Sequence, residues 1–219
     1  MLGIAVTSWA QDKSVNPGIN ASYLKEGMVV AEWVERLESE GREVAENRQA
    51  IIDRIGVTPG TVIGDIGTGT GLFLPAFSRA VTDSGRIYAV DIVDKFLAHI
   101  ETQKAKRGWT NVDPVLCTER SVELPPDSID LAFICNVYHH FEYPQDSLAS
   151  LRTALRNGGR LVLIDFKRIE GVSGAWAINH MRAGQEVFEA EITAAGFTKT
   201  AEITDLLKDN YFVIFEKTR

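Results

Sequence analysis

The order of short apolar runs after residue 60 limits this chain to a few folds. Runs typical of strands, at 61–66, 86–92, 112–117, 129–137 and 160–166, alternate with segments typical of helices, at 72–81, 93–107 and 145–155. The run at 129–137 is apolar almost throughout, which indicates a strand covered on both faces. This alternation predicts a doubly wound, mostly parallel α/β sheet.

The end of the chain departs from this alternation. A predicted helix at 184–195 is followed by two strands, near 197–203 and 211–217, which only TDLLKDN separates. Because this link is too short for a crossover helix, the two strands should pair antiparallel. We therefore expect a seven-stranded Rossmann-like sheet with an antiparallel C-terminal strand.

The region before the sheet is predicted to be helical. Between residues 23 and 55, apolar positions recur every three to four residues among many charges. With 219 residues, the chain is long enough for one well-buried domain. We expect a single domain over 1–219, in which 1–20 are flexible or a leader remnant, 21–56 form a helical lid and 57–219 form the cofactor-binding core.

Composition narrows the classes of partner. The net charge of −7 argues against a nucleic-acid partner, and no apolar run reaches the ~20 residues of a membrane span. Cys117 and Cys135 read as buried hydrophobes, and the four histidines lack metal-ligand spacing, so we predict no metal. We expect a cytoplasmic monomer or homodimer. Export is the alternative, because MLGIAVTSWA is similar to the end of a signal peptide.

A glycine turn, GDIGTGTG at 64–71, stands where the first strand ends. Glycines at 67, 69 and 71 let the backbone approach a ligand without obstruction by Cβ. Their spacing differs from the G-x-G-x-x-G of dinucleotide sites, and Asp65 would repel a phosphate but attract an ammonium group. Asp91 closes the second strand, where an acidic side chain can hold both ribose hydroxyls.

Together with two later motifs, these residues resemble the class I S-adenosylmethionine-dependent methyltransferases. The later motifs are LPPDSID at 124–130 and ALRNGGRLVLIDF at 154–166, which has Asn157 where the family usually has proline. The resemblance runs from about Ile51 to the C-terminus. It implies transfer of a methyl group from S-adenosyl-L-methionine to a small-molecule acceptor by in-line displacement, with S-adenosyl-L-homocysteine as the product.

The resemblance also implies a cofactor site, formed by Asp65, Gly67, Thr68, Gly69, Gly71, Asp91, Ile92, Thr118, Glu119 and Asn136. In that family Asp65 would lie near the amino group of the cofactor and Asp91 would hold its ribose. Ile92 would pack on the adenine, Thr118 and Glu119 would lie near the adenine amine, and Asn136 would line the methionine end.

The acceptor side is expected around NVYHHFEYP at 136–144, which follows the fourth strand. Tyr138, His139 and His140 are the candidate catalytic bases, although either histidine could instead hold the loop. A dedicated base is not essential, because aligning the reactants can supply about 7–11 kcal/mol of the barrier in the best cases. Candidates for the substrate pocket are Trp33, Arg42, Tyr143, Trp176, His180, Arg182 and Tyr211.

Two other functions remain open at this stage. One is an NAD-type Rossmann oxidoreductase, against which Asp65 and the glycine spacing count. The other is a non-catalytic module that binds S-adenosylmethionine. Within the methyltransferases, a lipid or quinone acceptor is an open case.

Overall fold

The computed structural model of the protein describes residues 11–38 and 42–218. Its helices are α1 (Val30–Glu38), α2 (Glu43–Glu46), α3 (Arg48–Ile55), α4 (Leu74–Val81), α5 (Asp94–Arg107), the 3-10 turn η1 (Tyr138–His140), α6 (Pro144–Ala154), α7 (Ala175–His180) and α8 (Gln185–Ala194). Its strands are β1 (Val62–Ile66), β2 (Arg86–Asp91), β3 (Val112–Leu116), β4 (Ile129–Cys135), β5 (Leu155–Phe166), β6 (Phe197–Glu202) and β7 (Asn210–Lys217).

The seven strands form one sheet in the order β3-β2-β1-β4-β5-β7-β6. The strands β3, β2, β1, β4 and β5 pair in parallel, whereas β7 runs antiparallel to both β5 and β6. The predicted sheet, including its antiparallel C-terminal strand, is therefore confirmed. The chain reverses its direction of winding between β1 and β4, and ligands of such sheets bind at this switch point, beyond the strand ends.

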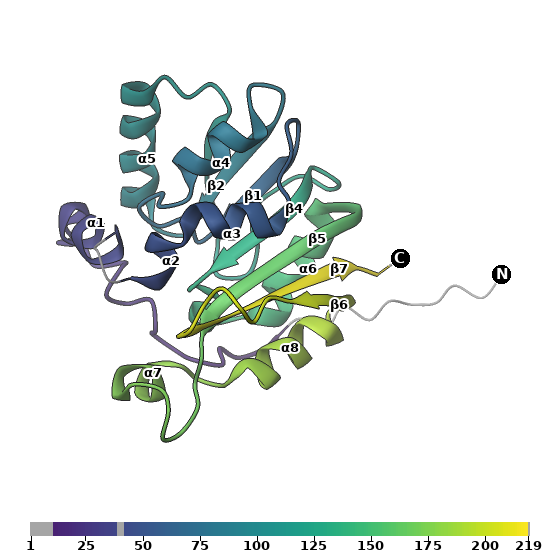
Figure 1. Ribbon diagram of the computed structural model, residues 1–219. Coiled ribbons are helices and arrows are strands. Elements are labelled where there is room, and N and C mark those ends of the chain that lie inside the picture. The colour runs from purple at the N-terminus through teal and green to yellow at the C-terminus, as the bar shows by residue number, and fades with distance from the viewer. Residues whose placement is uncertain (1–10, 39–41, 219) are drawn as a thin grey trace.

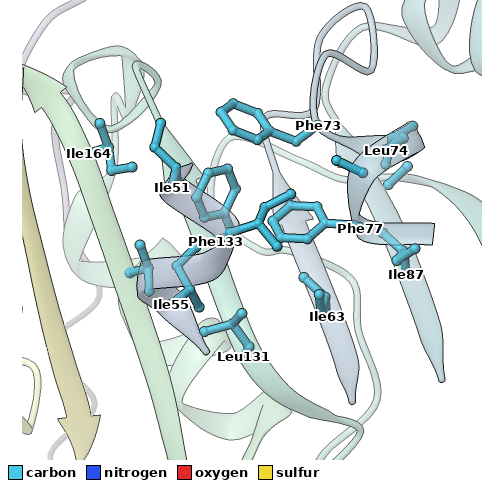
Figure 2. Packing of buried hydrophobic residues seen from close by; sticks show 14 of the residues in the cluster. Ile51, Ile55, Ile63, Phe73, Leu74, Phe77, Ile87, Leu131, Phe133 and Ile164 are labelled. Atoms are coloured by element: carbon cyan, nitrogen blue, oxygen red, sulfur yellow. The ribbon is translucent and has the colours of Figure 1, made fainter. Parts of the chain in front are cut away.

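Helices cover both faces of the sheet (Figure 1). Residues of α3, α4 and α5 bury their apolar side chains in one core cluster, and those of α6 and α8 in the other. The side chains of β4 alternate between the two, with Phe133 in the first cluster and Ile134 in the second. In the first cluster Phe133 packs edge-on against Phe73 and Phe77, with ring centroids 4.7 and 5.1 Å apart (Figure 2).

Helix α3 ends as its sequence predicts. Gly56 follows Ile55 with φ +70°, and its N–H bonds back to the carbonyls of Ile52 and Asp53. This left-handed C-cap satisfies two carbonyls that the helix leaves open. The chain then turns through residues 57–61 into β1.

Two segments differ from the expectation. The segment 167–184 between β5 and α8, for which the sequence predicted no helix before residue 184, contains the short helix α7. Strand β5 begins at Leu155, before the glycine pair, because Leu155 already pairs with Ile129 of β4. The register then shifts before Leu131 pairs with Arg160, so the glycines occupy an irregularity within the strand.

The N-terminal segment is better anchored than predicted. Residues 1–10, part of the expected flexible segment or leader remnant, lie outside the described residues. Residues 11–20 are held against the loop after η1, where Gln11 Nε2 and the Val15 amide both donate to the carbonyl of Glu142, at 3.1 and 2.9 Å. The Ser14 hydroxyl donates to the Glu142 carboxylate at 2.8 Å. These bonds attach the segment 11–20 to the loop after η1.

None of the helices in the described ranges, 11–38 and 42–218, is long and apolar enough to cross a membrane.

Candidate active site

A cavity opens at the carboxyl ends of β1, β2 and β4, where the topology predicts a ligand. Most of the predicted cofactor residues line it: Asp65, Gly67, Thr68, Gly69, Asp91, Ile92, Thr118, Glu119 and Asn136. Gly71 instead lies behind the turn, where a Cβ would meet Leu74 at 3.0 Å and Ile100 at 3.6 Å. Its φ of +89° lets the chain enter α4.

The backbone amides of the glycine turn are already bonded within the protein. The amides of Gly67 and Thr68 both donate to the carbonyl of Val90, at 2.8 and 3.0 Å. The Gly69 amide donates to Asp91 Oδ2 at 2.8 Å, and the Gly71 amide to the carbonyl of Thr68 at 3.0 Å. A pyrophosphate site depends on free amides at this turn. These bonds therefore count against a dinucleotide ligand.

Gly67 is the most constrained residue of the turn. Its φ is +69°, and a Cβ on it would lie 2.3 Å from a methyl carbon of Val137. Val137 follows β4, so the missing side chain lets the two strand ends lie close together. The glycine here serves packing between segments as well as access to the cavity.

Two carboxylates are buried at the floor of the cavity. The side chain of Asp65 accepts a hydrogen bond from the Thr68 hydroxyl at 2.7 Å, and that of Asp91 accepts one from the Val93 amide at 2.9 Å in addition to the Gly69 bond. Burial, and to a smaller extent the nearby Asp91, raise the pKa of Asp65 to about 7 against the opposing effect of the Thr68 hydrogen bond. Burial raises the pKa of Asp91 to about 6 against the opposing effect of its amide bonds. A ligand bringing positive charge or hydroxyl donors would offset this desolvation.

Asn136 is a third polar group that faces this space. It follows β4 with φ +55°, an uncommon conformation for a residue other than glycine. Its side-chain oxygen and nitrogen are both buried and lack a hydrogen-bond partner within the part of the chain that the structure describes. An unsatisfied buried amide costs free energy, so its donor and acceptor are groups that a polar ligand would satisfy.

The predicted adenine end lies at the rim. Thr118 and Glu119 are exposed, and Thr118 is held in a tight turn by a hydrogen bond from the Ser121 amide to its hydroxyl at 3.0 Å. The Ser147 hydroxyl donates to the Glu119 carbonyl at 3.1 Å. Ile92 is half-buried between this rim and the carboxylates.

The candidate bases separate into different environments. His140 lines the cavity, and burial, together with His139 and His180, lowers the pKa of its imidazole to about 2. His139 lies behind it, with Nδ1 2.8 Å from Asp165 Oδ1. Tyr138 points into the core, where its hydroxyl donates to Glu191 Oε2 at 2.9 Å and its ring packs on Phe188. The structure therefore directs Tyr138 away from the reacting groups expected here.

Few of the substrate-pocket candidates reach the cavity. Arg42 lines it and donates to the Leu37 carbonyl at 2.5 Å, and burial lowers the pKa of its guanidinium. His180 packs against His140, with ring centroids 5.2 Å apart. Trp33 lies one layer further out and packs on Tyr23, with ring centroids 4.3 Å apart and planes tilted by 30°.

The remaining candidates are occupied elsewhere. Arg182 forms a two-pronged ion pair with Glu191 at 2.8 and 2.6 Å, and Tyr143 lies under the guanidinium of Arg120. Tyr211 is buried in the core on β7, and Trp176, on α7, stacks on His180 at 4.7 Å. An aromatic ring or a charge in the sequence does not show whether a residue lines a pocket or packs elsewhere. The sequence therefore could not separate these four residues from those that line the cavity.

Several lining residues come from the segment before the sheet and were not predicted. Tyr23 and Leu37 line the cavity, and Leu37 lies 3.6 Å from where a Cβ of Gly69 would be. Asn20 is 6% exposed and donates to the His140 carbonyl at 3.0 Å. Tyr23 and Leu37 lie within the lid expected over 21–56, but helical periodicity does not say which side chains of that segment face a cavity.

Comparison with known proteins agrees with the geometry. Residues 64–163 match the family model described as a methyltransferase domain. The ubiquinone/menaquinone biosynthesis C-methyltransferase UbiE of Hahella chejuensis is 30% identical over 118 residues, which are 53% of this chain and 47% of that protein. UbiE of Enterobacter sp. is 30% identical over 128 residues, 57% of this chain and 51% of that protein. The chain thus spans about half the length of the curated relatives it matches.

Solved structures share the fold. A SAM-dependent methyltransferase from Aquifex aeolicus superposes with a TM-score of 0.77 at 21% identity, covering 86% of this chain and 98% of the other. The [4+2]-cyclase SpnF superposes with a TM-score of 0.66 at 16% identity, covering 80% of each chain. These similarities concern the fold, and the second relative is named for a different reaction.

The sheet order, the glycine turn and the match over residues 64–163 all resemble the class I S-adenosylmethionine-dependent methyltransferases. The match to the methyltransferase-domain model covers residues 64–163.

Proposed function

We propose that the cavity binds S-adenosylmethionine and that the protein transfers the methyl group of this cofactor to a small organic acceptor. When bound, the cofactor supplies a methyl group on a sulfonium, which a nucleophile can displace. The buried pair Asp65 and Asp91 carries the proposal, because two desolvated carboxylates beside self-bonded turn amides suit a cationic nucleoside and repel a pyrophosphate.

The donor set fits the two polar ends of this cofactor. The carboxylate of Asp91 accepts hydrogen bonds from the Gly69 and Val93 amides and has further lone pairs. These lone pairs can accept hydrogen bonds from the ribose hydroxyls. Asp65 favours a positively charged amino-acid end, and the unpartnered amide of Asn136 offers both a donor and an acceptor nearby. At the rim, Thr118 and Glu119 are the groups available to an adenine.

Residues of the segment before the sheet line the other side of the cavity. Tyr23, Leu37 and Arg42 face the strand ends, so we propose that residues 21–56 act as a lid over the bound cofactor. A dry, closed cavity strengthens the electrostatic interactions inside it and aligns the acceptor. The apolar side chains at this end, which include Val137 and Phe141, favour an acceptor with a large apolar part. The relatives named as ubiquinone/menaquinone C-methyltransferases support the same class of acceptor.

The proposal is tested by incubating the protein with methyl-labelled S-adenosylmethionine and a metabolite extract, and identifying the molecule that acquires the label. We expect one small organic product and release of S-adenosylhomocysteine. Cofactor binding to the Asp91→Ala variant should weaken about 10- to 100-fold, because charge-assisted hydrogen bonds are lost.

The exposed Asp94, three residues further on at the start of α5, provides a matched control. Asp94→Ala should leave the affinity for the cofactor unchanged in titration calorimetry. Equal losses in the two variants, or binding without turnover of any acceptor, would count against the proposal. The second outcome would favour a binding module or a different reaction on the same fold, as in the cyclase.

A further inference from the structure

Three of the four histidines of the chain gather at the edge of the cavity. His139 and His140 are on η1, and His180, 40 positions further along the chain, is the last residue of α7. The ring centroids of His180 lie 5.1 Å from His139 and 5.2 Å from His140, and those of His139 and His140 lie 4.3 Å apart. One nitrogen of each ring lies within 4.8 Å of the others. Sequence spacing could not reveal this cluster of histidines, because the third one comes from a separate helix.

A buried carboxylate orients the first of these rings. Asp165, on β5, is 0% exposed and lies 2.8 and 3.1 Å from His139 Nδ1 through its two oxygens. Asp165 also accepts a hydrogen bond from the His139 backbone amide at 3.2 Å, so the same carboxylate holds both the ring of His139 and the backbone of η1. With Nδ1 engaged, Nε2 remains as the ligand atom. Histidines that bind metal ions usually donate a hydrogen bond from their second ring nitrogen to a carboxylate, a backbone carbonyl or a water, and Asp165 is such a partner.

The other two rings are also held in position. His140 packs edge-on against Tyr23 at 5.3 Å, and its Nδ1 is buried without a hydrogen-bond partner in the described ranges. His180 stacks on Trp176 at 4.7 Å with planes 21° apart. Burial, together with His139 and Arg36, lowers the pKa of His180, and the carboxylate of Asp165 opposes this shift. The protein therefore keeps three imidazoles together, and one of them has a buried nitrogen that no group of the described residues satisfies.

We propose that His139, His140 and His180 bind a divalent transition-metal ion such as Zn²⁺, with Asp165 as the positioning residue of His139. Three imidazole ligands leave one position of a tetrahedral ion open, as in catalytic zinc sites. Nitrogen ligands favour zinc, copper or nickel over magnesium or calcium. A tetrahedral ion at ~2.0–2.1 Å holds its ligand atoms about 3.4 Å apart. Binding therefore draws the nitrogens closer, and His180, half-buried on the short helix α7, is the ring placed to move.

The place of the ion has a chemical consequence that rests on the proposed function. Because His140 also lines the cavity, the ion would lie where the acceptor is expected. An acceptor oxygen or sulfur bound to the open position would lose its proton more readily, since a metal ion stabilises the anion. The acceptor class would then be a phenol, an enol or a thiol.

The site is tested on the metal-free protein by titration with Co²⁺, followed by visible absorption in the absence of cofactor and acceptor. We expect saturation near one equivalent, with the intense absorption of a tetrahedral cobalt site, and displacement by Zn²⁺. His180→Ala should abolish this spectrum. Asp165→Asn should weaken binding about 10- to 100-fold, the usual effect of losing such a second carboxylate partner.

His99, the fourth histidine, lies on α5 and serves as the matched control. His99→Ala should bind Co²⁺ like the parent protein, and circular dichroism should show that all three variants are folded. Absence of saturable Co²⁺ binding by the parent protein, or a spectrum that survives His180→Ala, would overturn the proposal. Since no methyl transfer is measured, failure of the metal site and failure of the proposed methyltransferase activity remain distinguishable.

Discussion

The two ends of the cavity are built in different ways. At the end formed by β1 and β2, the polar groups lie within short stretches of sequence, and the turn bonds mainly to the neighbouring strand end through Val90 and Asp91. At the end formed by the loop after β4, the side chains come from the N-terminal segment, from η1, from β5 and from α7. The first end is compact in sequence, and the second is assembled from distant segments.

This difference has an electrostatic counterpart. The strand end contains two buried carboxylates whose pKa values are raised to about 7 and about 6, for Asp65 and Asp91. The loop end contains aromatic rings and three imidazoles, with the carboxylate of Asp165 behind them and that of Glu142 on the cavity wall. We infer that the strand end selects a cationic ligand and that the loop end selects the acceptor.

The largest effect is expected where the two ends touch. Gly67→Ala would place a Cβ within 2.3 Å of Val137, at a φ of +69°. Overpacking of this kind costs about 1–3 kcal/mol, in addition to the strain of the left-handed conformation. We expect a large fall in the urea midpoint and loss of cofactor binding. Gly108→Ala is the matched control, because Gly108 has φ +67° with open space around it. If both variants lost equal stability, the close approach of the strand ends would not be the cause.

Asp65→Asn should have opposite effects on stability and on binding. The carboxyl group has a higher pKa in the folded state than in the unfolded chain, so its contribution to stability is complete below about pH 4 and is lost as the pH rises through about 7. Without ligand, the variant should therefore be more stable than the parent near pH 8, by up to about 4 kcal/mol, and the difference should vanish near pH 4. Affinity for the cofactor should fall about 10- to 100-fold.

Urea denaturation at several pH values measures the first effect, and calorimetry near neutral pH measures the second. A variant that is less stable than the parent at every pH would show that Asp65 is stabilising as an anion. In that case the protein itself would stabilise the buried charge of Asp65, and no cationic ligand would be needed to offset its burial.

The smallest effect on activity is expected at Tyr138. Removing its hydroxyl with Tyr138→Phe deletes the bond to Glu191, which should lower the free energy of unfolding by about 1 kcal/mol. Turnover should stay within about twofold of the parent, because the ring packs in the core. A large loss of turnover with normal stability would restore Tyr138 as a candidate for catalysis.

The sequence was informative where short-range pattern determines structure. Strand alternation predicted the mostly parallel sheet and its antiparallel end, and the acidic residues singled out at the ends of β1 and β2 both line the cavity. It was uninformative where contact depends on tertiary packing. Nothing in the spacing of His139 and His180 indicates that η1 and α7 meet. Likewise, Arg182 and Arg42 look alike in sequence, yet one is paired with Glu191 and the other lines the cavity.

Titration calorimetry with S-adenosylmethionine and with NADH, at about pH 7.5 and about pH 5, tests the central claim most directly. We predict that S-adenosylmethionine binds at the higher pH and at least about tenfold more weakly at the lower one, where Asp65 and Asp91 become protonated. NADH should not bind at either. Binding of NADH, or an affinity for S-adenosylmethionine that is the same at both pH values, would contradict the claim that two buried carboxylates select the ligand.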